Sequence, residues 1–374
     1  MLQADIFRPD RLPVRDRSTW LELAAETPAF RSPLLGPAFA ELVGSVREDA
    51  HVAVFRRDGR TIGLLAHHRR PGALGRPIGA PWSDRHALIT APGAELDWRE
   101  ALDAAELRTF RFTALVDPYA LFSDAGVQDE EAAYAIAPAE PGDAYWETLR
   151  AASPKRFKNI RRLEHKLERE EGPVELVVGD RSPEALDLLI RWKREQFRRT
   201  GLHDVLHPGW SRALMETLFH EDGSELSGLL ITLRARGRVI AAHFGARAGG
   251  VYHPWLAAYD PAFAAWSPGL VFLSMAVRAM PQAGLTRYEL SAGSAHYKTA
   301  FADREELVAA GAAERGLSGP PLQRPVLLER VRRRLDHIAE TEITFGGRLQ
   351  GVAAAIGDLS KRLPAGGERI ASEA

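Results

Sequence analysis

The sequence predicts a mixed α/β fold in two similar halves, and three observations support this prediction. The chain has 374 residues, and a domain usually holds about 100–200. Residues 52–65 and 230–243 repeat one sequence pattern. In the second half, a helix–strand–helix pattern precedes three strand-like runs whose turns are too short for parallel pairing. These runs therefore predict an antiparallel meander within a mixed sheet.

The repeated pattern is an apolar run, a two-residue turn that ends in glycine, and a second apolar run. The identical pairs are Arg56 and Arg234, Gly59 and Gly237, Arg60 and Arg238, and Ile62 and Ile240. The turns Asp58-Gly59 and Arg236-Gly237 suit a type I′ hairpin, because glycine accepts a positive φ without a steric penalty. Unrelated hairpins can look alike, but a duplicated fold explains why each hairpin has similar neighbours.

Helical spacing, turn residues and apolar runs define the elements of the second half. A helix begins at Ser153-Pro154 and continues to about residue 169, and a second runs from Ser182-Pro183 to Gly201. We expect strands at 174–178, three within 229–260 and one at 287–290, with further helices at 270–280 and from Tyr297 to Phe301.

The first half shows fewer clear elements. We expect a hairpin over 52–67, a glycine- and proline-rich loop over 71–92, a strand over 108–116 and a linker over 137–142. The expected domains are therefore 1–140, 141–315 and a basic helical tail, 316–374. The tail helix carries apolar residues at Leu327, Leu328, Val331, Leu335 and Ile338 and ends before a frayed segment around Gly366-Gly367.

Composition excludes several classes of function. The net charge is −1, so no overall field attracts nucleic acid. Cysteine is absent, which rules out disulfides, thiolate metal sites and a cysteine nucleophile. We find no leader peptide, no apolar run of about 18 residues and no metal, phosphate-loop or dinucleotide motif. A cytoplasmic protein without a membrane-spanning segment or a metal is expected.

Three segments of the second half resemble a known family. They read SPKRFKNIRRLEHKLE at 153–168, AAYDPAFAAWSPGLVFLSMAV at 257–277 and RYELSAGSAHYKTAF at 287–301; FRSPLLGPAF at 30–39 and GRPIGAPWSDRHALI at 75–89 extend the likeness. The chain resembles the CelD-type acetyltransferases of the GNAT superfamily, which are similar to the FemAB transferases. This resemblance implies two tandem GNAT-like folds, with a degenerate first half on the acceptor side and an acyl-CoA site in residues 141–315.

The segment Ser267, Pro268, Gly269 and Leu270 is the expected binding site for the cofactor, acetyl-CoA or another acyl-CoA. It opens a helix directly after a strand, and unpaired N–H groups at a helix N-terminus attract the oxygens of a pyrophosphate. An ordinary helix cap is the structural alternative. Lys298 could bind a phosphate or a substrate carboxylate, or could simply be solvated.

The resemblance places Tyr297 near the sulfur of acyl-CoA, where its phenol could protonate the departing thiolate. A packed core tyrosine is the alternative. The acceptor amine needs a base, and His296 beside Tyr297 is preferred over His243 and His253. Tyr259 and Asp260 could line the acceptor cleft together with His243, although Asp260 could instead cap a turn.

Three functions remain open. The first is an N-acyltransferase that moves an acyl group from acyl-CoA to an amine, possibly in polysaccharide or cell-envelope biosynthesis. The second is a Fem-like transferase that uses aminoacyl-tRNA, with the basic segment 155–169 as a tRNA contact; this segment also suits a solvated helix face. The third is a non-catalytic accessory protein of polysaccharide production.

Overall fold

The computed structural model describes residues 2–293, 296–315 and 326–362. The first half consists of β1 (Gln3–Phe7), α1 (Val14–Glu26), α2 (Pro37–Val46), β2 (Ala50–Arg57), β3 (Arg60–Arg70), β4 (Leu74–Pro77), β5 (Ile89–Thr90), α3 (Trp98–Ala104), β6 (Thr109–Leu115) and β7 (Gly126–Ile136). Short 3-10 helices lie at Pro9–Arg11 (η1), Pro28–Phe30 (η2) and Pro33–Leu35 (η3).

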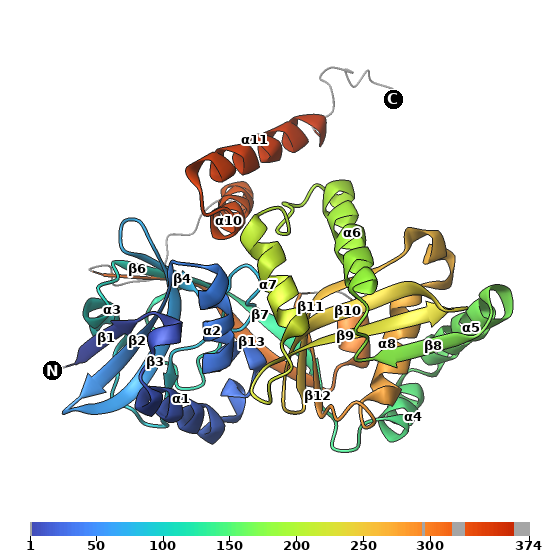
Figure 1. Cartoon of the computed structure of the whole chain (residues 1–374), viewed down its shortest axis with the longest axis horizontal. Helices are drawn as coiled ribbons and strands as arrows, with labels where there is room; N and C mark the ends of the chain where they lie inside the picture. The colour runs from blue at the N-terminus through green and yellow to red at the C-terminus, as the bar shows by residue number, and fades with distance from the viewer. Residues whose placement is uncertain (1, 294–295, 316–325, 363–374) are drawn as a thin grey trace, which may run out of the picture.

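The second half contains α4 (Asp143–Ala152), α5 (Pro154–Glu171), β8 (Val174–Val178), α6 (Pro183–Thr200), α7 (Gly209–His220), β9 (Ser227–Ala235), β10 (Arg238–Ala248), β11 (Val251–Tyr259), η4 (Pro261–Trp266), α8 (Pro268–Ala279), β12 (Arg287–Ala292), α9 (His296–Phe301) and β13 (Arg304–Glu314). Two further helices, α10 (Val326–Thr341) and α11 (Phe345–Arg362), lie above the body in Figure 1.

One mixed sheet of 13 strands runs through both halves in the order β1-β2-β3-β4-β6-β13-β7-β12-β11-β10-β9-β8, with β5 beside β3. Figure 1 shows it passing from the blue half at the left to the yellow half at the right. The two halves join where β7 pairs with β12, while β13 returns and inserts between β6 and β7. Loops that connect the strands at this junction can therefore contribute to a common site.

Both expected hairpins are confirmed. Residues Asp58 (φ 52°) and Gly59 (φ 74°) join β2 to β3, and Arg236 (φ 48°) and Gly237 (φ 78°) join β9 to β10. Two successive positive φ angles are the signature of the type I′ turn that the sequence predicts. The repeated pattern thus corresponds to the same local structure in both halves.

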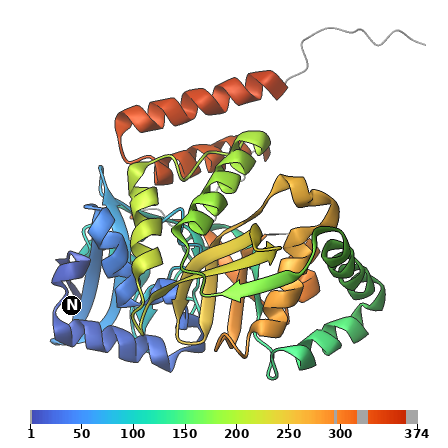
Figure 2. The same cartoon turned by 45° about the vertical axis from the view of Figure 1, so that its right-hand side comes forward.

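Helices cover both faces of the second-half sheet. Buried residues of α6 and α7 share a core with Phe244 and Leu256, and that core continues to α2 and α1 of the first half. Residues of α4, α5 and α8 pack on the opposite face, against Ile231 and Leu233. Figure 2 shows α6 and α7 on one side of the strands and α4 and α5 at the other edge. This two-sided cover fixes the positions of β10, β11 and β12.

Several details differ from the expected elements. The Ser153 side chain accepts no capping hydrogen bond, whereas Ser182 caps α6 by accepting one from the Ala185 N–H at 3.2 Å. Helices α4, α7 and α11 and strand β13 were not expected, and the expected loop 71–92 contains the short strands β4 and β5. The tail helix is present as α10, whose Ile338 is buried. Segments 316–325 and 363–374 and the side chains of Leu327, Leu328 and Val331 lie outside the described residues. None of the described helices is both long and apolar enough to span a bilayer.

Candidate active site

Strands β11 and β12 separate at the centre of the sheet. They pair in parallel only at Val251 with Arg287 and at Tyr252 with Tyr288. Each strand then continues, β11 to Tyr259 and β12 to Ala292, without further pairing between them. The two strands therefore enclose a wedge-shaped opening that begins beside the Tyr288 ring.

A β-bulge on β11 shapes the same region. Gly245 of β10 is paired with Pro254 and Phe244 with Leu256, so Trp255 is the extra residue. A Cβ atom at Gly245 would lie 2.1 Å from the His253 carbonyl oxygen and 2.7 Å from the Trp255 nitrogen. Only glycine fits this close approach of two backbones. Bulges of this kind re-aim side chains and occur beside active sites.

Two adjoining cavities, of about 430 and 310 Å³, form one groove along this opening. They share four lining residues: Lys193, His243, Ala257 and Tyr297. The larger cavity reaches Tyr259, Ser267, Gly269 and Leu270 at the start of α8. The smaller reaches Trp82, Asp84, Trp255, Ser291 and Lys298 at the junction of the halves. The groove thus connects the N-terminus of α8 with a loop of the first half.

The N-terminus of α8 is open toward the larger cavity. Ser267 has a positive φ of 48°, its side chain makes no capping hydrogen bond, and the first helical turn contains no acidic residue. A Cβ atom at Gly269 would meet only the Tyr259 ring, at 3.9 Å. Anionic ligands are stabilised at such an end by the helix dipole and by N–H groups. The expected cofactor residues Ser267, Gly269 and Leu270 therefore line the groove, whereas Pro268 does not.

Tyr297 lies where the two cavities meet, and Lys298 lines the smaller one. Tyr297 lines both cavities and remains 42% exposed, while partial burial raises the pKa of its phenol. The Lys298 ammonium donates hydrogen bonds to the carbonyl oxygens of Ser291, at 3.3 Å, and Ala292. Burial lowers the pKa of Lys298, and the negative charges of Asp84 and Glu131 oppose that effect. A protonated phenol thus lies where the cavities join, while the ammonium group is bound by backbone carbonyls beside the smaller cavity.

His243 is tightly held in the wall of the groove. Its ring stacks on Phe272 at 4.0 Å between centroids, and its Nδ1 lies 2.6 Å from the Tyr288 hydroxyl. Burial, with a smaller contribution from the positive charge of Lys193, lowers the pKa of His243 to about 3. Lys193 itself lines both cavities, and burial lowers its pKa as well. His243 is therefore neutral at physiological pH and oriented by Tyr288.

Asp84, from the loop between β4 and β5 of the first half, lies against β11 and β12. Its Oδ1 is 2.5 Å from His253 Nε2, and the Ser291 hydroxyl is 3.5 Å from the same nitrogen. Burial raises the pKa of Asp84, but the charge and hydrogen bond of His253 outweigh it and bring the pKa to about 2. Because Asp84 and Ser291 meet one ring nitrogen, this cluster cannot act as a Ser-His-Asp relay, which uses both nitrogens.

An ion-pair network holds the Asp84 loop in place. Arg85, which is buried, contacts Glu289 of β12 at 3.4 Å and Glu306 of β13 at 2.6 Å. Arg287 contacts the same two carboxylates at 2.6 and 2.8 Å. Each carboxylate thus has two guanidinium partners, which satisfies buried charges that would otherwise be destabilising. The network fixes the residue next to Asp84 to strands of the other half.

The remaining expected residues lie elsewhere. His296 is exposed and lines neither cavity. Asp260 accepts the Ala262 N–H at 3.0 Å as the cap of η4 and pairs with Arg238 at 2.6 Å. Tyr259 lines the larger cavity. Asp84, Trp82, Lys193 and Glu289 were missed, since only the tertiary packing of distant segments brings them to the groove. Within the described residues, no three His, Asp or Glu side chains are grouped to hold a metal.

Comparison with known proteins agrees with this fold. Residues 154–299 match the family model of the acetyltransferase (GNAT) domain. A crystal structure of FemX has the same fold over 82% of this chain and 96% of its own, with 11% identity and a TM-score of 0.53. The expected mixed α/β, GNAT-type fold is confirmed; the narrower CelD-type assignment stays a prediction.

Other solved structures are more distant in shape. The C-terminal domain of a putative lysylphosphatidylglycerol synthetase from Agrobacterium fabrum covers 81% of this chain and 92% of its own (14% identity, TM-score 0.49). A tandem GNAT protein from the clavulanic acid biosynthesis pathway covers 85% of this chain and 100% of its own (14% identity, TM-score 0.46). No curated protein matches the chain.

Proposed function

We propose that this protein is an N-acyltransferase that moves an acyl group from acyl-CoA to an amine. One observation carries the proposal: a single groove runs from the open N-terminus of α8, past Tyr297, to the Asp84 carboxylate of the other half. Such a groove offers an anion-binding end, a proton donor and a carboxylate in the order that this reaction requires. The match of residues 154–299 to the acetyltransferase domain supports the same reaction.

The α8 end of the groove fits the anionic part of acyl-CoA. The cofactor supplies an acyl group activated as a thioester. Its phosphates need donors that approach closely, and the space around Gly269 allows this because even a Cβ atom there would have its nearest neighbour 3.9 Å away. Lys193, which lines the same cavity, adds a positive charge when it is protonated.

Tyr297 is the proposed proton donor to the departing thiolate. Its raised pKa keeps the phenol protonated at neutral pH, so a proton is available when negative charge develops. Lys298 lines the smaller cavity, where the sequence predicts that it binds a phosphate or a substrate carboxylate. Both roles stay predictions, and the position of each residue in the groove supports them.

The acceptor amine enters from the Asp84 side. Asp84 is ionised at neutral pH, since its pKa is about 2. It can therefore bind an ammonium group in the smaller cavity, which Trp82 and Trp255 also line. With a pKa this low, Asp84 is a poor base at neutral pH, so its role in the proposal is to bind the amine, and the proton that the amine releases passes to water in the groove. His296 lies outside both cavities, and its role as the base stays an untested prediction.

Calorimetric titration with acetyl-CoA tests the proposal. Gly269→Asp places a carboxylate at the second residue of α8, and we expect it to abolish binding by repelling the phosphates. Gly346→Asp is the matched control, because Gly346 is the second residue of α11 and has open space around it. Binding by the wild type and by Gly346→Asp, but not by Gly269→Asp, supports the proposal. Absence of heat with the wild type at millimolar acetyl-CoA rejects it.

Only the family resemblance noted in the sequence narrows the choice of acceptor amine. That resemblance favours an amine on a small molecule or a cell-envelope sugar precursor. A screen of amines for release of free CoA thiol, with the Tyr297→Phe variant as the background, identifies the acceptor directly. An amine that releases thiol equally with both proteins is not the enzymatic substrate.

A further inference from the structure

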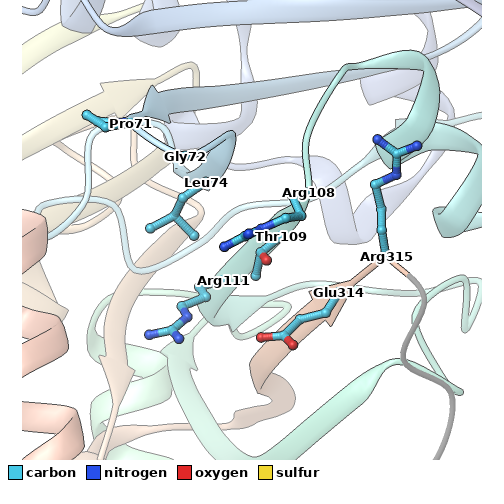
Figure 3. A pocket seen from close by; sticks show the side chains of 8 residues that line it. All are labelled: Pro71, Gly72, Leu74, Arg108, Thr109, Arg111, Glu314 and Arg315. Atoms are coloured by element: carbon cyan, nitrogen blue, oxygen red, sulfur yellow. The ribbon is translucent and has the colours of Figure 1, made fainter.

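A third cavity, of about 340 Å³, lies at the ends of several strands of the first-half sheet. It is formed where the turn after β3, the start of β6 and the end of β13 meet (Figure 3). Its polar side chains are those of Arg108, Thr109, Arg111, Glu314 and Arg315. Three guanidinium groups and one carboxylate thus line the cavity.

This cavity is separate from the acyl-transfer groove. Glu306 of β13 contacts Arg85 and Arg287 beside the groove, whereas Glu314 at the end of the same strand lines this cavity. Eight residues of extended strand separate them, which is about 26 Å at ~3.3 Å per residue. A ligand here does not occupy the groove.

The arginines differ in how far the described residues neutralise them. The Arg108 guanidinium forms no ion pair or hydrogen bond with any described residue. Arg111 donates through Nη1 to Asp336 at 2.9 Å, but its Nε is buried without a partner in the described part of the chain. Arg315 is paired with Asp103. Within the described residues, the Arg108 guanidinium is therefore the cation of this cavity that is left to bind an anion.

The strand register places these groups on one surface. Thr109 and Arg111 are two residues apart on β6, so they point to the same face, while Phe110 and Phe112 point into the core. Glu314 is the cross-strand partner of Thr109. In Figure 3, Arg108 and Arg111 extend to the same side, and the Glu314 carboxylate reaches toward the same space, whereas Arg315 points away.

We propose that this cavity binds a small phosphate monoester that also carries an ammonium or hydroxyl donor. The guanidinium groups of Arg108 and Arg111 bind the phosphate oxygens, and the Thr109 hydroxyl adds a neutral donor. Guanidinium suits this role because its planar donors match phosphate oxygens. Glu314 accepts a hydrogen bond from the ammonium or hydroxyl group, and it disfavours anions that lack such a donor.

Calorimetric titration with O-phosphoethanolamine and with ethyl phosphate tests this proposal. We expect the wild type to bind O-phosphoethanolamine at least tenfold more tightly than ethyl phosphate. Arg108→Gln should weaken both ligands about tenfold, the loss typical of one charge-assisted hydrogen bond. Glu314→Gln should remove the preference for the ammonium group while retaining ethyl phosphate.

Two controls separate specific binding from the effect of overall charge and from the acyl-CoA site. Arg161→Gln removes one exposed arginine of α5 and should leave binding unchanged. Gly269→Asp should also leave it unchanged, even if that variant loses acetyl-CoA. The proposal is overturned if the wild type binds neither ligand at about 10 mM, because a dissociation constant above that concentration is too weak for specific recognition. Equal losses with Arg108→Gln and Arg161→Gln overturn it as well.

Discussion

His253 Nε2 of β11 lies 2.5 Å from Asp84 Oδ1, a carboxylate from the loop between β4 and β5 of the other half. The contact spans the junction of the two halves and brings an ionised carboxylate to the groove that Tyr297 lines. Neither half alone therefore holds all the polar groups of the candidate active site.

Replacement of Asp84 by asparagine tests the acceptor side. Asp84→Asn keeps the shape of the side chain but removes the charge that binds the amine, so kcat/KM for the amine should fall by roughly 10- to 100-fold. The dissociation constant of acetyl-CoA should stay within about twofold. Asp58→Asn, in the exposed β2–β3 turn, is the matched control and should behave as the wild type. A larger loss of acetyl-CoA binding than of turnover would contradict the assignment.

The Tyr297→Phe variant removes only a hydroxyl group. We expect kcat to fall by roughly 10²-fold, because the thiolate then leaves without a proton donor. Acetyl-CoA affinity and thermal stability should barely change, since the ring remains in place. Steady-state kinetics with release of free CoA thiol measures the effect. Equal kcat values for the variant and the wild type would exclude Tyr297 as the acid.

Gly245→Ala tests the bulge. The new methyl group would lie 2.1 Å from the His253 carbonyl oxygen, so the strands must move apart. We expect a loss of about 2–3 kcal/mol in the free energy of unfolding, as for other overpacked sites. Gly209→Ala, at a helical position with open space, should have little effect or stabilise the protein. Urea denaturation compares the two variants, and equal midpoints would show that the bulge tolerates a side chain.

Buried histidines should make the fold sensitive to acid. Burial lowers the pKa of His67, His68 and His337 to about 4 and of His86 and His243 to about 3. The unfolded chain, with histidine pKa values near 6.5, binds protons that the folded chain does not. The free energy of unfolding is therefore not reduced by these histidines above about pH 6.5. It decreases from there toward pH 4, by up to about 1.4 kcal/mol per pH unit for each histidine.

Urea denaturation at pH 7.5 and pH 5 measures this loss. His86 is a suitable probe because its Nε2 accepts the Ala114 N–H at 3.4 Å, which requires a neutral ring at that atom. His86→Gln should reduce the pH slope by about one proton, even if the variant is less stable at all pH values. An unchanged slope would mean that the pKa of His86 is the same in the folded and the unfolded chain.

Local patterns were sufficient to predict most of the second half. Ser182-Pro183 and the left-handed Gly201 correctly mark the two ends of α6. The Arg236-Gly237 turn correctly separates β9 from β10. Helix α7 was missed although Leu214, Met215 and Leu218 recur at helical spacing. Strand β13 could not be recognised, because its alanine- and glycine-rich sequence has weak strand propensity and is held by pairing with β6 and β7.

The residues of the candidate site likewise fall into two groups, those predicted from the sequence and those missed. The segment 267–270 and the Tyr297-Lys298 pair were predicted, since each has a local signal in turn residues or in a family resemblance. Asp84 was not, because it lies in a loop rich in glycine and proline and meets His253 only through the packing of distant strands. No periodic pattern in the sequence predicts the contact between Asp84 and His253.

A crystal structure with a thioether analogue of acetyl-CoA tests the central claim most directly. The account predicts that the pantetheine arm lies between β11 and β12, with the pyrophosphate at the N–H group of Gly269 and the thioether sulfur beside Tyr297. An analogue bound at another surface, with the groove between these strands empty at saturating ligand, would contradict it.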